Sequence, residues 1–592
     1  MVLAFAFLLV LLLALEGRLF FLQILRSPAT VLLVTRYQLR DVKEPRARGR
    51  IVDRSGRALA ESVPAYDIEL WRPALGAASR PRDIIDRAHL MATTLGRFLP
   101  ITAAQLLPSA GSRPYALLRA DVTEPSVVLP IMQLAENGKL RGVDLRRDYA
   151  RRYPHGELTG WTVGYVNHEQ DGVFGIEGMY DQVLKPKAGE RTLRHDGRNV
   201  EYFDPCLDAD PGAAGSDVVL TIDLLLQDIV HSALGKTVAE HAPDQVVAIV
   251  TNPRTGDVLA VDQWPPLDPE QLNKVHGDGW SNRAFQDYYT PGSTFKPFIM
   301  ALALDRHVVQ LGETIDCENG RLSVPGRKPI TDVHPLGVVP LAEVIVHSSN
   351  VGMVKVGQHL VPADEPKGGS HFRPVLQTLQ ALGFGSLSGL GFPCENPGRL
   401  TALKDWTRNY TLTSVSFGYE VGVTAVQMAA AYSVFCNGGW LQPLRIVKQI
   451  EHADGTITPC APRARRRVYG AAAADAVRDM MVGVVEEGTG KQVEFPPIGI
   501  AGKSGTTTPP GRFDPEQGRA KVASFVAFAP AQDPTLLVLV VARKNAVKST
   551  YYGATVAGPA VREILEKGLA LDGVVVAPVA RGSGEEAAHA GF

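Results

Sequence analysis

Cysteine is scarce in this chain, and the few cysteines do not form a recognisable ligand set. None stands in a Cys-x-x-Cys pair or at metal-ligand spacing from a histidine, so they predict no metal site. The odd count leaves at least one thiol unpaired within the chain, although one disulfide can form if this part of the protein is extracytoplasmic. The five cysteines are Cys206, Cys317, Cys394, Cys436 and Cys460.

A net charge is also lacking. Lys and Arg number 61 and Asp and Glu 62, so the formal net charge is −1 and bulk electrostatics predict no nucleic-acid binding. Apolar residues make up 45% and charged residues 21% of the chain, which is typical of a folded globular protein and excludes general disorder. A length of 592 residues is enough for two or three domains with a sizeable core.

Long hydrophobic runs are absent after residue 25. The strongest later run, TLLVLVVA at Thr535–Ala542, is short and bounded by charged residues and proline, so it predicts a buried strand. The N-terminus differs, because Val2–Leu15 is an unbroken apolar run. Glu16-Gly17-Arg18 interrupts it, and LFFLQIL continues it to Leu25.

Residues 1–25 are therefore expected to form one transmembrane helix. About 24 residues at 1.5 Å each would cross a hydrocarbon core of about 30 Å. A cleaved signal peptide is the alternative, and the absence of a small-x-small cleavage site favours the anchor. Basic residues follow the run and none precedes it, so the positive-inside rule would place the body of the chain in the cytoplasm unless a further segment lies upstream.

Two larger regions and a tail come after the N-terminal run. Residues 27–210 alternate short predicted strands with Gly/Pro turns, and RGRIVDRSGRALAES indicates a hairpin that turns at Ser55-Gly56. Residues 215–572 are expected to form a second domain. Residues 573–592 are rich in Gly, Ala and Glu and predict a disordered tail.

The second region has strands at both ends and helices between them. DVVLTIDLLLQDIVHSAL predicts a strand and then a helix capped by Asp223, and QVVAIVTNPRTGDVLAVDQW predicts two strands around a turn at 252–256. Helix-rich sequence spans about 290–435, and the chain closes with the strands ASFVAFAP and TLLVLVVARK and a helix near 560–569. This order predicts an α+β domain whose sheet is completed by its C-terminal strands.

The segment YYTPGSTFKPFIMALAL sets a serine and a lysine three residues apart at the start of an apolar helix. Helical spacing puts Ser293 and Lys296 on one face, one turn apart, close enough for a hydrogen bond. Burial and the helix dipole disfavour an ammonium there, so the lysine could accept the proton of a serine nucleophile. The alternative is a capping serine and a solvated lysine, and the pair alone does not decide between them.

Two further segments carry residues that could work with this pair. VIVHSSNVGMVKVG presents Ser348, Ser349 and Asn350 ahead of an amphipathic helix, where they either transfer protons or simply cap the helix. GIAGKSGTTTPPG comes after a short strand, and its lysine, hydroxyls and backbone amides could hold a carboxylate and face an oxyanion, or it could be a surface turn. The residues concerned in the second segment are Lys503, Ser504, Gly505 and Thr506.

Taken in order, Ser-x-x-Lys, Ser-x-Asn and Lys-Ser-Gly match the motifs of the penicilloyl-serine transferases. The resemblance to class B penicillin-binding proteins extends over about residues 18–570. The block at 48–56 is similar to the non-catalytic pedestal of that class, and SSN and SFGYE are more similar to the cell-division branch, the penicillin-binding protein 3 type. The other segments that carry the resemblance are RRYPHGELTGWTVGYV, GIEGMYDQVL, VVLTIDLLLQ, NRAFQDYYTPGSTFKPF, EEGTGKQVEFPPIGIAGKSGT and YYGATVAGPAV.

The resemblance implies a fold and a location. The fold would be the α+β penicillin-binding transpeptidase fold, an antiparallel sheet flanked by helices, at 215–572. It would stand on a mostly β, dimerisation-like pedestal at 27–210. The chain would be a single-pass protein of the inner membrane with its catalytic domain extracytoplasmic, which conflicts with the basic residues after the N-terminal run.

The resemblance also implies a reaction and partners. A stem peptide ending in D-Ala-D-Ala would acylate a serine, and the amine of a neighbouring stem would then form a peptide crosslink during septal cell-wall synthesis. β-Lactams would acylate the same serine. The implied partners are the membrane, a polytopic membrane glycosyltransferase and other division proteins, without nucleic acid, metal or organic cofactor.

Each motif residue acquires an implied role. Ser293 would be the nucleophile and Lys296 its proton acceptor, Ser348 would relay a proton to the departing D-alanine, and Asn350 would hold the substrate amide and Lys296. Lys503, which is counted with the catalytic residues, would bind the terminal carboxylate region together with Ser504 or Thr506. The implied substrate-binding residues are Ser349, Ser504, Gly505 and Thr506, with the backbone amides of Ser293 and Thr506 as the oxyanion hole.

Two other functions stay open. The chain could be a β-lactam- or peptidoglycan-binding scaffold, against which the intact motifs argue, or a D,D-carboxypeptidase, against which the pedestal and anchor argue. Two segments depart from the family pattern. TTPPGRFDPEQGR comes after Lys-Ser-Gly-Thr where the family often continues Ala-Gln or Ala-Arg, and the loop at 361–374 looks like an insertion.

Overall fold

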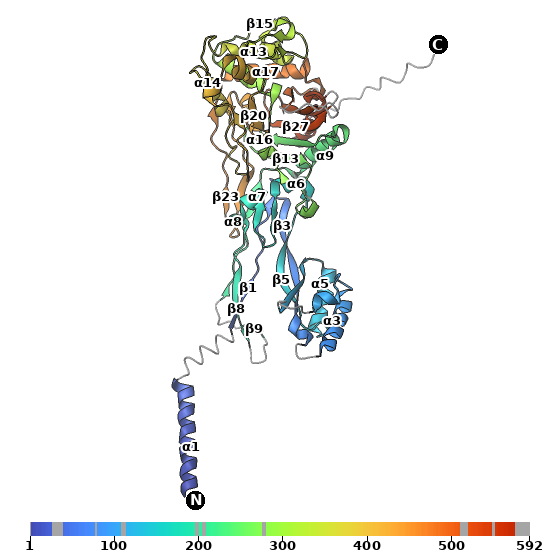
Figure 1. Ribbon diagram of the computed structural model, residues 1–592, viewed down its shortest axis with the longest axis vertical. Coiled ribbons are helices and arrows are strands. Elements are labelled where there is room, and N and C mark those ends of the chain that lie inside the picture. Colours follow the sequence, from blue (N-terminus) through green and yellow to red (C-terminus); the bar gives the residue numbers. More distant parts are fainter. Residues whose placement is uncertain are drawn as a thin grey trace, which may run out of the picture. The chain divides into compact units, whose positions relative to one another are not determined.

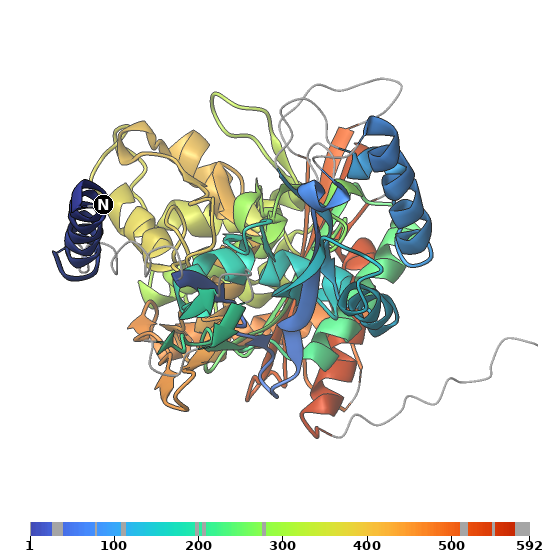
Figure 2. The same ribbon diagram turned by 90° about the horizontal axis from the view of Figure 1, so that it is seen from below.

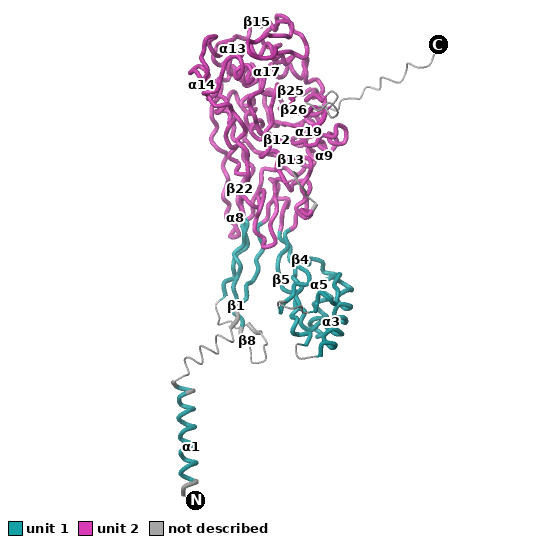
Figure 3. The backbone as a smooth tube through the Cα atoms, viewed as in Figure 1, with its two compact units in different colours: residues 1–49, 62–151, 184–216 teal, residues 50–61, 152–183, 217–592 magenta. Residues whose placement is uncertain are grey.

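The computed structural model describes residues 2–25, 39–76, 80–107, 114–195, 201–203, 209–274, 280–495, 497–508, 519–547 and 551–574. The chain divides into two compact units, which Figure 3 colours separately. The first unit comprises residues 1–49, 62–151 and 184–216, and the second comprises residues 50–61, 152–183 and 217–592. Most of the predicted tail, from residue 575 on, and Cys206 lie outside the described residues.

The second unit is built on a five-stranded antiparallel sheet with the order β13-β12-β27-β26-β25. The N-terminal strand pair therefore hydrogen-bonds to a C-terminal strand, which confirms the predicted completion of the sheet. The run predicted as a buried strand is the core of β27. The strands are β12 (Gln245–Thr251), β13 (Val258–Trp264), β25 (Ala501–Thr507), β26 (Arg519–Ala529) and β27 (Leu536–Val547).

Helices cover both faces of this sheet, and for this reason long parts of β12, β26 and β27 are apolar and buried. On one face, α9 (Leu224–His241) and α19 (Gly558–Leu571) lie side by side, in green and red in Figure 2. Their buried side chains, among them Val230 and Ile564, join the strands in one core cluster. The other face carries α16 (Ala425–Cys436), whose residues are almost all buried. The predicted helix-flanked antiparallel sheet is confirmed.

A layer of helices between β13 and β25 confirms the predicted helix-rich stretch (Figure 1). Its helices are α10 (Arg283–Gln286), α11 (Lys296–Asp305), α12 (Leu341–Val346), α13 (Asn350–His359), α14 (Phe372–Ala381), α15 (Thr413–Ser416), α16 and α17 (Ala471–Glu486). The three-stranded sheet β14-β20-β19 accompanies them, with β14 (Tyr288–Tyr289), β20 (Val421–Thr424) and β19 (Arg399–Leu400). The short helix α18 (Gly553–Val556) comes after β27.

Smaller elements complete the second unit. Its second sheet has the order β23-β22-β11-β2, and its two-stranded ribbons pair β6 with β7, β15 with β18, β16 with β17, and β21 with β24. The bounds are β2 (Ile51–Val52), β6 (Tyr165–Val166), β7 (Gly172–Phe174), β11 (Asp217–Leu220), β15 (Thr314–Asp316), β16 (Arg321–Leu322), β17 (Ile330–Thr331), β18 (Val338–Pro340), β21 (Trp440–Leu441), β22 (Val447–Glu451), β23 (Ile457–Pro459), β24 (Arg466–Arg467), α6 (Gly156–Val163), α7 (Gly175–Met179) and α8 (Asp181–Leu184).

Two local predictions are confirmed by hydrogen bonds. The hairpin between β2 and β3 (Ala58–Trp71) turns at Ser55-Gly56, where the Asp53 carboxylate accepts the amides of Ser55 and Arg57 and Gly56 takes a positive φ of 87°. Only glycine adopts such a φ without strain. Asp223 caps α9, because its carboxylate accepts the backbone amides of the second and third helical residues.

The first unit is less purely β than expected. Besides β1 (Leu39–Glu44), β4 (Tyr115–Val122), β5 (Val143–Arg152), β8 (Gly189–His195), β9 (Glu201–Phe203), β10 (Ala209–Asp210) and part of β3, it holds α3 (Pro81–Leu95), α4 (Ala103–Leu106) and α5 (Pro125–Glu136). These helices share one apolar core with β3 and β4. α5 continues through Pro130, although a proline inside a helix usually ends it.

The N-terminal residues form α1 (Val2–Phe20), followed by a π-helical turn at Phe21–Leu25. In the part of the chain that the structure describes, no helix combines the length and apolarity that a membrane crossing requires. The anchor at 1–25 therefore stays a prediction.

The cap on α9 gives the first testable prediction. Asp223→Ala should lower the free energy of unfolding of the second unit by about 1 kcal/mol, because two backbone amides lose their acceptor. Urea denaturation followed by circular dichroism measures the change. Asp228→Ala is the matched control, since Asp228 is exposed on the same helix, and it should shift stability by less than about 0.5 kcal/mol. Equal effects of the two variants would contradict the capping role.

Candidate active site

The turn that carries Ser293 is held in place by buried hydrogen bonds. Residues Gly292–Phe295 form a 3-10 turn that leads directly into α11. The Thr294 hydroxyl donates to the carbonyl of Pro291 at 2.9 Å, and the buried Tyr432 hydroxyl, from α16, donates to the carbonyl of Thr294 at 2.5 Å. The predicted helix start is therefore confirmed, and Ser293 sits half-buried on a fixed turn.

Two glycines let strand β25 lie against this turn. Gly292 has a φ of 57°, and a Cβ on it would lie 2.3 Å from the Thr507 methyl carbon. A Cβ on Gly505 would lie 2.8 Å from the carbonyl oxygen of Pro291. Real side chains do not make such approaches, so the Pro-Gly and Lys-Ser-Gly glycines both serve close packing. β25 is an edge strand of its sheet, so no strand among the described residues pairs with its outer side, and the Ser293 turn contacts it.

Ser348 joins the lysines of the other two motifs. It lies between α12 and α13 with a positive φ of 59°, a conformation that is uncommon for residues other than glycine. Its hydroxyl oxygen is 3.2 Å from Lys296 Nζ and 3.0 Å from Lys503 Nζ. Lys296 also donates to the Ser348 carbonyl at 2.6 Å, and Lys503 donates to the carbonyl of Ser504 at 3.2 Å. One hydroxyl therefore bridges two amines.

Both lysines are completely buried, which changes their protonation. Burial, reinforced by the neighbouring Lys503, lowers the pKa of Lys296 well below its ordinary value, and the Asp332 carboxylate opposes this only in part. Burial lowers the pKa of Lys503 to about 7. Two ammonium groups around one hydroxyl would repel each other, so the cluster favours a state with at least one neutral amine. A neutral Lys296 is what a general base for Ser293 requires.

Asp332, which the sequence did not single out, organises the start of α13. Its carboxylate accepts the Ser349 hydroxyl at 2.6 Å and the backbone amides of Asn350 and Val351. The Ser349 hydroxyl in turn accepts the amide of Gly352 at 2.9 Å and caps the helix. Ser349 is buried in this network, so the helix-capping interpretation fits this residue. No local pattern around Asp332 marks this role, because it arises from a contact between the residue directly after β17 and the start of α13.

Two expected hydrogen bonds are not made in the described structure. Lys296 turns to Ser348, and no hydrogen bond links it to Ser293 or to Asn350 among the described residues. The Asn350 amide nitrogen instead donates to the carbonyl of Thr331 at 2.8 Å. Contacts of this kind often tighten only when substrate is bound. The roles of Ser293 and Asn350 toward substrate stay predictions.

The hydroxyls of β25 keep protons available for an anion. Thr506 Oγ1 accepts the amide of Gly553 at 2.9 Å, so its own proton is free to be donated. Ser504 Oγ lies 3.2 Å from Thr489 Oγ1, and that pair shares one hydrogen bond between two hydroxyls. Their predicted part in carboxylate binding is compatible with this arrangement. Within the described ranges, no group of three or more His, Cys, Asp or Glu side chains is arranged to hold a metal ion.

Comparison with known proteins identifies two family models that together match most of the chain. The family model described as the penicillin binding protein transpeptidase domain matches residues 246–566, and the one described as the penicillin-binding protein dimerisation domain matches residues 43–220. The chain belongs to the penicillin-binding transpeptidase family. The family predicted from the three motifs is thereby confirmed.

Relatives of this transpeptidase-family chain are similar over nearly its full length. The probable peptidoglycan D,D-transpeptidase PbpC of Pseudomonas aeruginosa is 31% identical over 93% of this chain and 92% of the relative. The peptidoglycan D,D-transpeptidase FtsI of Escherichia coli is 29% identical over 93% of this chain and 88% of the relative.

Solved structures confirm the predicted penicillin-binding transpeptidase fold. A peptidoglycan synthetase from Bifidobacterium adolescentis has 25% identity and a TM-score of 0.68, with 91% of this chain and 98% of that chain covered. Penicillin binding protein 2X from Streptococcus thermophilus reaches a TM-score of 0.71 at 21% identity, over 92% of this chain and 82% of that chain.

The Asp332 network gives the second prediction. Asp332→Ala should slow acylation by a fluorescent penicillin about 10- to 100-fold, because Ser349 and Asn350, which directly follow Ser348, lose the hydrogen bonds that hold them in place. Asp332→Asn, which keeps one acceptor oxygen, should reduce the acylation rate constant less than Asp332→Ala. Stopped-flow measurement of the acylation rate constant checks both variants, with the exposed Asp364→Ala as a control that leaves the rate unchanged. Parental rates in Asp332→Ala would show that the network does not position the site.

Proposed function

We propose that this chain is a peptidoglycan D,D-transpeptidase, a serine acyltransferase that crosslinks stem peptides during septal cell-wall synthesis and is acylated by β-lactams. The observation that carries the proposal is the Ser348 hydroxyl shared by two buried lysines beside the Ser293 turn. The similarity to proteins named peptidoglycan D,D-transpeptidases supports the reaction, and the similarity to FtsI supports the division role.

In the first half of the reaction, neutral Lys296 takes the proton of Ser293 as the serine oxygen attacks the carbonyl of the penultimate D-alanine. The backbone amides of Ser293 and Thr506 stabilise the oxyanion. Ser348 then passes a proton from the lysines to the departing D-alanine amine as the peptide bond breaks. An ester on Ser293 and free D-alanine are the products of this half.

In the second half, the amine of a neighbouring stem peptide attacks the ester carbonyl. Lys296 accepts a proton from that amine, the ester bond breaks, and the proton returns to Ser293. The open side of β25 offers backbone groups with which an extended donor peptide can pair as an added strand. Protonated Lys503, with Ser504 and Thr506, attracts the terminal carboxylate of the donor before acylation.

We also propose the domain arrangement and location that the sequence predicts. Residues 1–25 would anchor the chain to the inner membrane, 27–210 would form the pedestal, and 215–572 the extracytoplasmic transpeptidase domain. Exposed apolar side chains along α1, such as Phe5 and Leu13, are unfavourable in water and support the anchor. A polytopic glycosyltransferase and other division proteins are the proposed membrane partners.

Two alternative functions differ from transpeptidation in the fate of the acyl group. A D,D-carboxypeptidase would pass the acyl group to water, and a scaffold would bind without turnover. Incubating the full chain with a D-Ala-D-Ala stem peptide and an acceptor amine separates the three. Mass spectrometry should detect the crosslinked product together with D-alanine. Release of D-alanine without crosslink would favour the carboxypeptidase, and no turnover would favour the scaffold.

The third prediction concerns the nucleophile. Ser293→Ala should abolish covalent labelling by a fluorescent penicillin and keep the parental unfolding transition, because a half-buried hydroxyl is lost without a change in packing. Gel fluorescence and mass spectrometry of the intact chain check it. Ser386→Ala, at an exposed serine elsewhere in the unit, is the control and should label normally. Persistent labelling of Ser293→Ala would move the nucleophile elsewhere.

The fourth prediction concerns pH. Acylation efficiency should rise with pH as Lys296 loses its proton, and fall as Lys503, whose pKa burial lowers to about 7, loses the charge that attracts the carboxylate. Because the two lysines interact, the apparent pKa values of the rising and falling limbs of the pH profile belong to the pair and not to either lysine alone. Arginine stays protonated, so Lys296→Arg should acylate about 10²–10⁴-fold more slowly. Lys503→Arg should lack the falling limb near pH 7.

Measuring the second-order acylation constant of the parent and both variants between pH 5 and 9 decides this point. A falling limb that persists in Lys503→Arg would assign it to another group. Parental rates in Lys296→Arg would show that the base lies elsewhere.

A further inference from the structure

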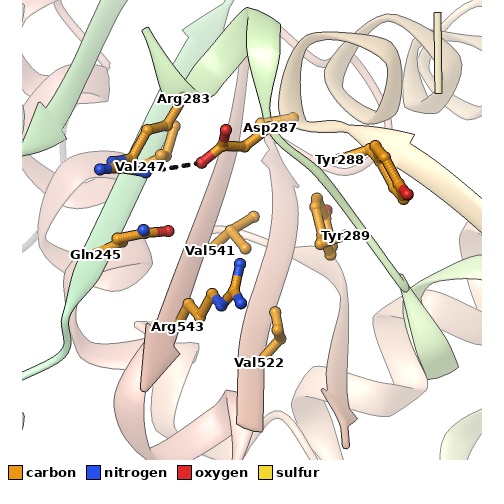
Figure 4. Close-up of a pocket in the computed structure, with 10 residues that line it drawn as sticks. Gln245, Val247, Arg283, Asp287, Tyr288, Tyr289, Val522, Val541 and Arg543 are labelled. Carbon is orange, nitrogen blue, oxygen red and sulfur yellow. Dashed lines mark hydrogen bonds and ion pairs between the residues drawn. The ribbon is translucent and has the colours of Figure 1, made fainter. Parts of the chain in front are cut away.

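A large open pocket lies within the second unit, and its lining includes Thr290 and Thr508, which are close in sequence to the Ser293 turn and to β25. Its volume is about 990 Å³, and its walls come from the small sheet β14-β20-β19 on one side and from the ends of β12, β26 and β27 on the other. A smaller cavity of about 40 Å³ shares several of these residues, and Figure 4 shows Gln245 and Arg543 on strands of the large sheet opposite Tyr288 and Tyr289. None of the predicted catalytic residues of the three motifs lines the large pocket.

The pocket is continuous with the reaction site along the chain. Thr290, which precedes the Ser293 turn, and Thr508, which comes directly after β25, both line it. Tyr419 lines it as well, and its hydroxyl accepts a hydrogen bond from the backbone of Thr508. A strand advances about 3.3 Å per residue, so Thr508 lies roughly 7 Å beyond Thr506. A peptide paired with the open side of β25 would reach the pocket two or three residues upstream of its D-Ala-D-Ala end.

The charges that face the pocket favour an anion. Arg283 is buried and forms an ion pair with Asp287 at 2.9 Å, so that pair is neutral. Arg399 and Arg543 are exposed and form no ion pair among the described residues. Arg543 donates instead to the side-chain oxygen of Asn545 at 3.1 Å.

The remaining charged group in the pocket is Glu420, so two guanidiniums face one carboxylate. Tyr289 lines the same pocket, its buried hydroxyl has no hydrogen-bond partner among the described residues, and its burial raises its pKa. A planar guanidinium binds a carboxylate through two parallel hydrogen bonds, which makes it selective for this group. The pocket is therefore suited to a ligand segment with a net negative charge.

We infer that this pocket is a donor-peptide subsite, in which Arg399 and Arg543 bind a free carboxylate of the stem peptide upstream of its D-Ala-D-Ala end. The inference rests on the proposed transpeptidase function and adds to it a preference for acidic donors. The carboxylate can belong to the second residue of the stem or to a diamino residue at the third. Arg399 and Arg543 do not touch the reacting atoms, so they would set specificity and leave the chemistry unchanged.

Three synthetic pentapeptide donors test the inference with the full chain. One carries a free carboxylate on the second residue only, one on the third residue only, and one has both positions amidated. The parent should use at least one acidic donor about 10-fold or more better than the amidated donor in kcat/KM. The double variant Arg399→Gln/Arg543→Gln should lose that preference, and higher salt should weaken it in the parent.

Two controls separate this inference from the proposed function. A penicillin whose acyl side chain has no carboxylate lacks the group that the pocket would bind, so its acylation rate should be unchanged within about 2-fold in the double variant, which also shows that the fold is intact. Arg465→Gln removes an exposed arginine elsewhere and should keep the parental preference. The inference is overturned if the parent shows no preference for either acidic donor, or if the double variant retains it. Failure of the parent to react with penicillin would instead overturn the proposed function.

Discussion

Two buried lysines share one serine hydroxyl, and the rest of the site is arranged around that contact. A buried ammonium without a partner is strongly unfavourable, so the cluster persists only because Ser348 and nearby carbonyls accept its hydrogen bonds and because an amine can give up its proton. The apolar helix α11, buried over almost its whole length, keeps water away from Lys296. The lowered pKa values of the two lysines therefore depend on the exclusion of water, to which segments far apart in the sequence contribute together.

The sheet determines how those segments meet. β25 pairs with β26, β26 with β27 and β27 with β12, so the strand that carries Lys503 belongs to the same sheet as the N-terminal strand pair. Glycines at 292 and 505 remove the side chains that would hold the strand and the turn apart. The three motifs are far apart in the sequence, and the sheet topology brings them together in the fold.

The sequence predicted the elements better than their contacts. Asp223 and the Ser55-Gly56 turn are local signals, because a cap or a tight turn is decided by neighbours along the chain, and both were predicted correctly. The family was predicted from motif order. Asp332 was not predicted, since its partners lie on another element, and the helices α3, α4 and α5 were not predicted in a region interpreted as short strands and turns. The bond from Lys296 to Ser348 instead of Ser293 likewise depends on how α11 and α12 pack, which no spacing in the sequence specifies.

The same burial that activates the lysines costs stability. A lysine whose folded pKa is lowered binds fewer protons folded than unfolded, so the folded state gains stability as pH rises toward the ordinary lysine pKa and loses it as pH falls. For Lys503, whose pKa burial lowers to about 7, the cost at neutral pH is roughly 4 kcal/mol. A domain that is typically stable by about 5–15 kcal/mol must offset this cost elsewhere. The aromatic packing of Phe298 with Tyr432 and Phe435 behind α11 lies next to the site, where dispersion and apolar burial contribute to that offset.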